Sequence, residues 1–219
     1  MKKLISLVVV VLLILAGIFF GSPYYTAYQL KEAYDAKDGA AIAEAIDYEQ
    51  LQSNLSGQLT DSLQQTLTQY PMVTQLAGPA LEQAADDFIT NAVKGAVQPE
   101  NIEQLITTQG QANTATKQLA AAWAIASNQV NLQNLIQDVI TQRGNIDGVI
   151  QQQMQLMMDK QAEVLEQQAA QGNDTDKPSL SYCGINCFTI SGQVKGYPLT
   201  IEMQRQGFVD WKIVNIVLP

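Results

Sequence analysis

The stretch Leu4–Phe20, LISLVVVVLLILAGIFF, carries no charged residue and directly follows two lysines. A helix of this length is roughly 25 Å long, close to the thickness of a bilayer core at about 30 Å. Tyr24 and Tyr25 extend it with aromatic rings, which favour the membrane interface. The sequence therefore predicts a membrane anchor over residues 1–21. We take Leu4, Val10, Leu15 and Phe20 as its representative residues.

The alternative is a signal peptide that is cleaved, which requires small residues three and one positions before the cut. The available pairs, Phe19 with Gly21 and Tyr25 with Ala27, fit this requirement poorly. We therefore expect an uncleaved anchor that crosses the membrane once. Positively charged flanks stay in the cytoplasm, so the lysines before the apolar run predict a cytoplasmic N-terminus and a periplasmic location for the bulk of the chain.

The composition of the chain excludes several classes of function. The 219 residues carry a net charge of −9, include two cysteines and contain no histidine. An acidic surface repels phosphate backbones, so we expect no nucleic-acid partner. The absence of histidine excludes His-dependent catalytic triads and His-ligated metal sites, and two cysteines are too few for a four-thiolate site. We expect no catalytic residue set, no metal site and no cofactor.

Residues 22–108 show apolar residues at spacings of three and four, which predicts a series of amphipathic helices. Asp47, with Gln50 three positions on, has the pattern of a capping box at the start of one of them. Pro99 is suited to the first turn of another. Proline and Asp-Gly or Gly-Pro pairs mark the breaks between helices. The breaks that we expect lie at Pro23, Asp38-Gly39, Pro71 and Gly78-Pro79.

The acidic side chains of this helical part have structural explanations, because helix caps and turns use such residues routinely. Adjacent acids on a helix point about 100° apart, so a neighbouring pair does not form a general acid and base. We therefore expect no catalytic role for them. The residues concerned are Asp35, Asp38, Asp47, Asp86 and Asp87.

Two parts of the chain, roughly Ser22–Ile106 and Leu180–Pro219, contain short sequence motifs. The first part has Ser22-Pro23-Tyr24, Tyr28, Leu30, Ala33, Asp38, Ile46-Asp47, Leu51, Leu55, Val97-Gln98-Pro99-Glu100 and Leu105, and the second has Trp211-Lys212-Ile213-Val214 and Leu218-Pro219. With these residues the chain resembles a bacterial envelope family catalogued as domain of unknown function 2939. The resemblance implies a short N-terminal membrane segment, a helical body and a place in the bacterial inner membrane. The family brings no known activity and so implies no site residues.

The chain changes character after residue 108. Residues 109–172 are rich in glutamine and keep a helical period, which predicts an inserted helical hairpin, and residues 173–179 have a linker composition. Over residues 180–219 the apolar period becomes two, as in Val209, Trp211 and Ile213, which predicts an antiparallel β-meander of three or four strands packed on residues 22–108. The turns of the meander are expected at Gly192-Gln193 or Lys195-Gly196, and at Gln206-Gly207.

Cys183 and Cys187 are separated by Gly-Ile-Asn. In a straight strand, residues four apart lie about 13 Å from each other, which is too far for a disulfide. Glycine and asparagine permit a tight loop that brings the two together, and an extracytoplasmic location favours oxidation. We expect a disulfide here. A reactive pair is the less favoured alternative, because oxidoreductases use a two-residue spacing.

The sequence as a whole predicts an α+β protein with an N-terminal membrane helix, a mostly helical middle and a C-terminal antiparallel sheet of three or four strands that packs on the helices. This order resembles the nuclear-transport-factor-2-like fold, a cone in which helices lie across a bent sheet. That resemblance implies a pocket between the helices and the sheet, and says little about function.

Three functional hypotheses remain. The favoured one is a membrane-anchored, non-enzymatic module outside the cytoplasm that binds an envelope protein or an apolar ligand. The second is a structural or assembly protein that self-associates through its glutamine-rich helices. The third is an enzyme that uses carboxylates in a cleft between helices and sheet, and it requires at least two polar side chains converging there. The sequence leaves the ligand, the partner and the oligomeric state open.

Overall fold

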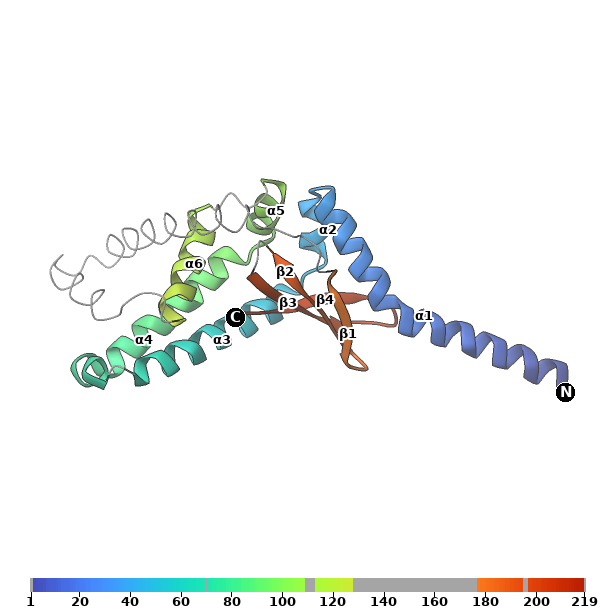
Figure 1. Ribbon diagram of the computed structural model, residues 1–219, viewed down its shortest axis with the longest axis horizontal. Helices are drawn as coiled ribbons and strands as arrows, with labels where there is room; N and C mark the ends of the chain where they lie inside the picture. The colour runs from blue at the N-terminus through green and yellow to red at the C-terminus, as the bar shows by residue number, and fades with distance from the viewer. Residues whose placement is uncertain (1, 70, 109–112, 128–176, 195–196, 219) are drawn as a thin grey trace.

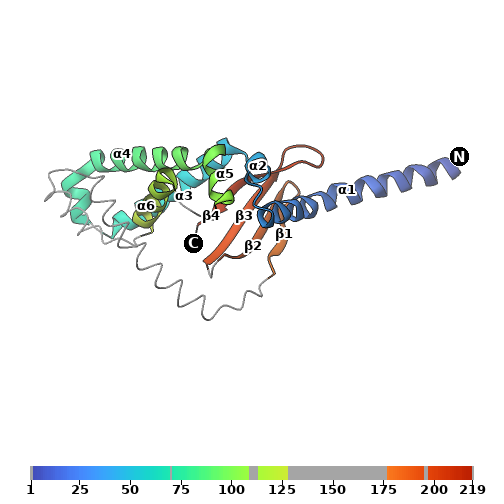
Figure 2. The ribbon, with the colours of Figure 1, turned by 90° about the horizontal axis from the view of Figure 1, so that it is seen from above.

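The computed structural model describes residues 2–69, 71–108, 113–127, 177–194 and 197–218 (Figure 1). It confirms the predicted α+β class, with a helical part followed by a sheet. Two views at right angles show α3, α4 and α6 at one end, the sheet in the middle and the N-terminal half of α1 projecting from the other end (Figures 1 and 2). The elements are α1 (Lys2–Asp35), α2 (Gly39–Glu44), α3 (Tyr48–Thr68), α4 (Pro71–Ala96), α5 (Pro99–Thr107), α6 (Thr114–Ala126), β1 (Ser179–Gly184), β2 (Cys187–Val194), β3 (Tyr197–Arg205) and β4 (Trp211–Val217).

Helix α1 continues through Pro23, so the break expected at that residue is wrong. Proline lacks an N–H group and leaves the carbonyl four residues earlier, that of Phe19, without its helical donor. Two other groups donate to this carbonyl: Oγ of Ser22 at 2.9 Å and Nη2 of Arg205, from the end of β3, at 3.0 Å. The predicted boundary between the anchor at 1–21 and the helical part at 22–108 therefore lies inside one continuous helix.

The caps of α2 and α3 follow the predicted pattern with one difference. Asp38 caps α2, and Asp47 caps α3 by accepting from the Gln50 backbone N–H at 3.1 Å. In a capping box the Gln50 side chain bonds the cap residue's own N–H. Here Gln50 Nε2 instead donates to the Asp47 carboxylate, because the Asp47 N–H already donates to the carbonyl of Ile213 in β4.

The predictions for α4 and α5 are confirmed in part. Pro71 begins α4 and Pro99 stands in the first turn of α5, as expected. The interruption expected at Gly78-Pro79 is wrong, since α4 runs on to Ala96. The C-terminal half of α4 packs its buried face, which includes Val93, against α3 and α6. This packed half lies C-terminal to Gly78-Pro79, so tertiary contacts stabilise the helix on that side of the pair.

Helix α6 is the described portion of the stretch that the sequence assigns to a glutamine-rich insertion. It packs on α3 and α4, and the Thr66 hydroxyl of α3 donates to the carbonyl of Ala126 at 2.8 Å. The face of α6 that packs on these two helices consists of buried alanines, which let the helices approach closely. The rest of the predicted hairpin and residues 173–176 of the predicted linker lie outside the described residues.

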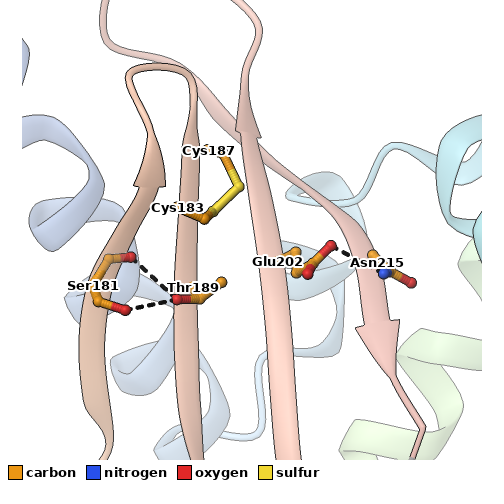
Figure 3. Close-up of a disulfide and its surroundings, with 6 residues drawn as sticks. All are labelled: Ser181, Cys183, Cys187, Thr189, Glu202 and Asn215. Carbon is orange, nitrogen blue, oxygen red and sulfur yellow. Dashed lines mark hydrogen bonds between the residues drawn. A yellow bond between two sulfur atoms is a disulfide. The ribbon is translucent and has the colours of Figure 1, made fainter.

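The sheet is a four-stranded antiparallel meander in the order β1-β2-β3-β4, which is the upper of the two predicted strand numbers. Strand β2 runs to Val194, so Gly192-Gln193 lies inside it, and Lys195-Gly196 lies outside the described residues. Strand β3 ends at Arg205, directly before the expected turn at Gln206-Gly207. One face carries Tyr182, Phe188, Met203 and Ile213 in register and packs into the core. The other face carries a polar row across the same strands (Figure 3). This row consists of Ser181, Thr189, Glu202 and Asn215.

Leucines four residues apart on α3 form the helical side of the core. They are Leu51, Leu55, Leu59, Leu63 and Leu67, and each is buried. They belong to one cluster with Phe188 and Met203 of the sheet, both at 0% exposure. The interface between helices and sheet, where the cone analogy implies a pocket, is therefore occupied by side chains at this cluster. The likeness to the cone fold itself stays a prediction.

Candidate functional site

A groove of about 900 Å³ lies between α1, α2 and the hairpin that joins β3 to β4. One face of α1 forms its longest wall, through residues spaced by three and four from Ile18 to Ala33. At about 1.5 Å per residue, this wall is roughly 22 Å long. The groove thus begins on the apolar half of α1 and ends beside α2. Its place differs from the predicted pocket, because no residue of α3 or of the first three strands lines it.

The lining of the groove combines apolar surface with a few polar groups. Tyr25 and Leu30 of α1 face Val209 and Trp211 across it. The charged groups Glu44 and Lys212 lie at the end beside α2, Asp210 lies in the hairpin, and uncharged polar residues lie along α1. Lys212 Nζ donates to the backbone carbonyl of Glu44 at 2.6 Å, which ties β4 to α2. This arrangement suits a molecule with an apolar body and one polar end.

The floor of the groove rests on a junction between α1 and the sheet, which we call the anchor junction and define as Phe19, Ser22, Arg205 and Trp211. Trp211 is 3% exposed, and its Nε1–H donates to Oγ of Ser22 at 2.9 Å. The same hydroxyl donates to the carbonyl of Phe19. Buried indole N–H groups need an acceptor, and the hydroxyl of Ser22, the residue directly before Pro23, supplies it here. Trp211 thus fixes the first strand position of β4 to α1.

Arg205 lies between the two aromatic rings of the anchor junction. Its guanidinium carbon is 3.6 Å from the centre of the Phe19 ring and 4.3 Å from that of Trp211. Its nitrogens donate to the carbonyl of Phe19 at 3.0 Å and to that of Phe208 at 2.6 Å. A planar guanidinium suits this role because it stacks on rings while its N–H groups reach carbonyls in the plane. Arg205 therefore joins α1 to the tip of the β3–β4 hairpin.

Tyr182 of β1 makes a second connection to α1. Its hydroxyl donates to the carbonyl of Phe20 at 2.8 Å, and its ring packs edge-on against Phe20, Phe188 and Trp211. Burial raises the pKa of the Tyr182 phenol, and the nearby charge of Arg205 partly opposes the rise. The phenol therefore stays protonated at neutral pH and keeps its donor.

Cys183 and Cys187 form a disulfide with Cα atoms 5.0 Å apart (Figure 3). The close approach arises because the chain turns between β1 and β2, where the pairing is irregular between Tyr182 and Gly184. Both cysteines lie on the polar side of the sheet at the end that faces α1. The Asn186 carbonyl in this turn accepts from the backbone N–H of Arg205, so the turn also borders the anchor junction.

Replacing both cysteines by serine should lower the free energy of unfolding by about 2 kcal/mol, because the bond closes a short loop and constrains the unfolded chain only modestly. Chemical unfolding of the full chain in detergent, with and without reductant, measures the difference. The serine variant serves as the control, since reductant should leave its transition unchanged. Equal stability of the oxidised and reduced wild-type chain would contradict the prediction.

The acidic residues considered in the sequence occupy caps and surface positions. Asp38 and Asp47 cap helices, and Asp86 accepts from the Thr60 hydroxyl. Asp35 pairs with Lys31, and Asp87 is exposed. None of these five lines the groove. Its carboxylates are those of Glu44 and Asp210, which the sequence analysis did not select.

The sequence contained a signal for part of the anchor junction. Ser22 and Trp211 both belong to the motif stretches of the sequence, and the structure brings them into contact. Arg205 lay in no motif, because an arginine near the end of a strand is common and only its contacts distinguish it. Its partners are Phe19, Ser22 and Phe208.

The predicted anchor residues Leu4, Val10, Leu15 and Phe20 all lie in α1. From Ser6 to Asp35 this helix is long and apolar enough to cross a membrane, and the side chains from Leu7 to Leu15 are exposed. The N-terminal helix thus has the length and composition of a membrane anchor or of a signal sequence.

A comparison with known families finds a match for the N-terminal part of the chain. The family model described as "Protein of unknown function (DUF2939)" matches residues 12–105, which cover the second half of the apolar stretch and the helical part as far as α5. The motif stretch at the C-terminus lies outside the matched residues. No curated protein and no solved structure matched the chain. The match supports the assignment of this chain to the DUF2939 family, as its N-terminal motifs predicted.

Proposed function

We propose that this protein is a single-pass, inner-membrane module of the bacterial envelope whose periplasmic part binds an apolar ligand in the groove beside α1. The observation that carries the proposal is the groove itself, about 900 Å³ in volume, which starts at Ile18 on the apolar half of α1. Pockets for small ligands fall in the range of about 300–1,000 Å³. A lipid-like molecule could enter from the membrane and extend along α1.

The contacts of the anchor junction support an uncleaved anchor. Cleavage after Gly21 would remove Phe19, whose ring and carbonyl bind Arg205, and Phe20, whose carbonyl accepts from Tyr182. The periplasmic part is thus built around residues that a signal peptide would lose. The disulfide between Cys183 and Cys187 agrees with an oxidising compartment.

The chemistry of the groove favours binding over catalysis. Its polar residues include Glu44, Asp210 and Lys212, and the lysine is already engaged by a backbone carbonyl. We therefore propose that the polar end of the ligand lies beside α2 and its apolar body lies against Tyr25 and Leu30. Self-association through the glutamine-rich stretch stays a prediction, because most of that stretch lies outside the described residues.

The test uses the full chain in nanodiscs that contain a phospholipid with a photoactivatable group on its polar headgroup. We expect crosslinks to α2, which lies at the far end of the groove from the apolar half of α1 (Figure 1). Replacing Ala41 by tryptophan, which fills the groove, should reduce these crosslinks at least tenfold. Replacing the neighbouring Ala40, which does not line the groove, by tryptophan should leave the number of crosslinks unchanged.

Crosslinks confined to the apolar half of α1, in the wild-type chain, would refute the ligand proposal. Purification of the wild-type chain and both variants from cells, followed by native mass spectrometry, tests whether a polypeptide occupies the groove instead of a lipid. A polypeptide that is retained by the Ala40→Trp variant and lost from the Ala41→Trp variant would replace the lipid as the partner.

A further inference from the structure

We infer that the tip of the β3–β4 hairpin, residues 206–210, inserts into the outer interface of the membrane as a second contact beside the anchor. This inference rests on the part of the proposed function that keeps α1 in the membrane. The partner is the lipid bilayer at the boundary between acyl chains and headgroups. The contact would fix the orientation of the periplasmic part on the membrane, which a single helix alone does not do.

The depth of the hairpin tip follows from its contacts with α1. The Phe208 ring lies 5.4 Å from that of Phe19, centre to centre. An apolar helix that begins at Leu4 needs about 20 residues to cross the bilayer core, so the crossing ends near Tyr24. Phe19 is more than one helical turn inside that limit. Phe208 packs against it and so lies on the acyl-chain side of the boundary, within the roughly 5–10 Å to which interfacial apolar side chains are buried.

Two of the five residues at the tip, Phe208 and Val209, carry apolar side chains that an interfacial position favours. Phe208 is 53% exposed and Val209 is 40% exposed, although both are apolar. The sequence predicted that Val209 faces inward from a strand, whereas β4 begins only at Trp211. The adjacent turn, at the same end of the sheet, carries Ile185, which is 64% exposed. Exposed apolar side chains thus gather where the sheet meets the membrane helix.

Hydrogen bonds hold the hairpin tip closed and fix its position relative to α1. The loop is closed by the Gln206 N–H, which donates to the carbonyl of Asp210 at 3.0 Å. Arg205 connects the loop to α1 through the carbonyls of Phe208 and Phe19. The hairpin and α1 therefore meet the membrane as one unit.

The test places a single environment-sensitive nitrobenzoxadiazole probe on an introduced cysteine in the full chain, without reductant so that the native disulfide does not react. The chain is reconstituted in nanodiscs of phosphatidylethanolamine and phosphatidylglycerol, with or without lipids that carry a nitroxide quencher on the acyl chain. The sites are Val209→Cys, which keeps the Phe208 ring, and Phe208→Cys. Leu12→Cys reports the anchor, and Gln64→Cys, an exposed position on α3, reports water.

We expect the probes at positions 208 and 209 to be quenched at least half as strongly as the probe at position 12, and the probe at position 64 not to be quenched. If position 12 is quenched while positions 208 and 209 behave like position 64, the inference fails and the anchor stands. If position 12 is not quenched, the anchor itself fails, and the hairpin proposal fails with it.

Discussion

Replacing Trp211 by alanine should lower the free energy of unfolding by about 3–5 kcal/mol, the usual cost of deleting a buried aromatic side chain. The indole is 3% exposed, belongs to the core cluster and donates to Ser22. Domains of this size are stable by only about 5–15 kcal/mol, so the loss would be a large fraction of the total. The variant should also loosen the sheet from α1, because the Trp211 ring supports Arg205.

The measurement is equilibrium unfolding of the full chain in detergent, followed by circular dichroism. Trp211→Phe is the matched control, because it keeps an aromatic ring in the core and loses the hydrogen bond to Ser22. Its cost should be nearer 1 kcal/mol, with an added contribution from the smaller ring. An alanine variant that unfolds within 1 kcal/mol of the wild-type chain would show that the indole is not packed as described.

Replacing Leu59 by alanine should cost about 2–5 kcal/mol, because its side chain is 1% exposed at the middle of the α3 stripe and leaves a cavity among the core residues. This change tests the opposite side of the core from Trp211. Ser53→Ala is the control on the same helix, at an exposed position, and should stay within about 0.5 kcal/mol. The same unfolding experiment measures both. Similar losses in the two variants would contradict the assigned burial of the α3 stripe.

Local patterns were sufficient for most of the secondary structure. The leucine spacing on α3 and the cap at Asp47 depend on residues three or four apart, and such neighbours interact within one helix. The change of period from about 3.6 to two over the C-terminal part likewise reports a property of adjacent residues. These patterns predict the elements correctly because the apolar residues that form each pattern are the residues buried in the core.

Predictions that depended on a helix-breaking residue were less successful. Pro23 and Pro79 are both inside helices, although proline is unfavourable in a helix interior. At Pro23 the reason is visible, since Arg205 and Ser22 supply the hydrogen bonds that the Phe19 carbonyl lacks. Arg205 is far away in the sequence, and no local rule brings it to this carbonyl. The groove was missed for the same reason, because its walls come from α1, α2 and a hairpin near the C-terminus.

The sequence by itself determined the apolar N-terminal helix, the order of helices and strands, and the absence of histidine chemistry. Each of these depends on composition or on neighbours along the chain. The tertiary structure decided where the sheet meets α1, that the helix continues past Pro23, and that Phe208 lies beside Phe19. Those features depend on contacts between segments separated by most of the chain, and only packing around a common core brings such segments together.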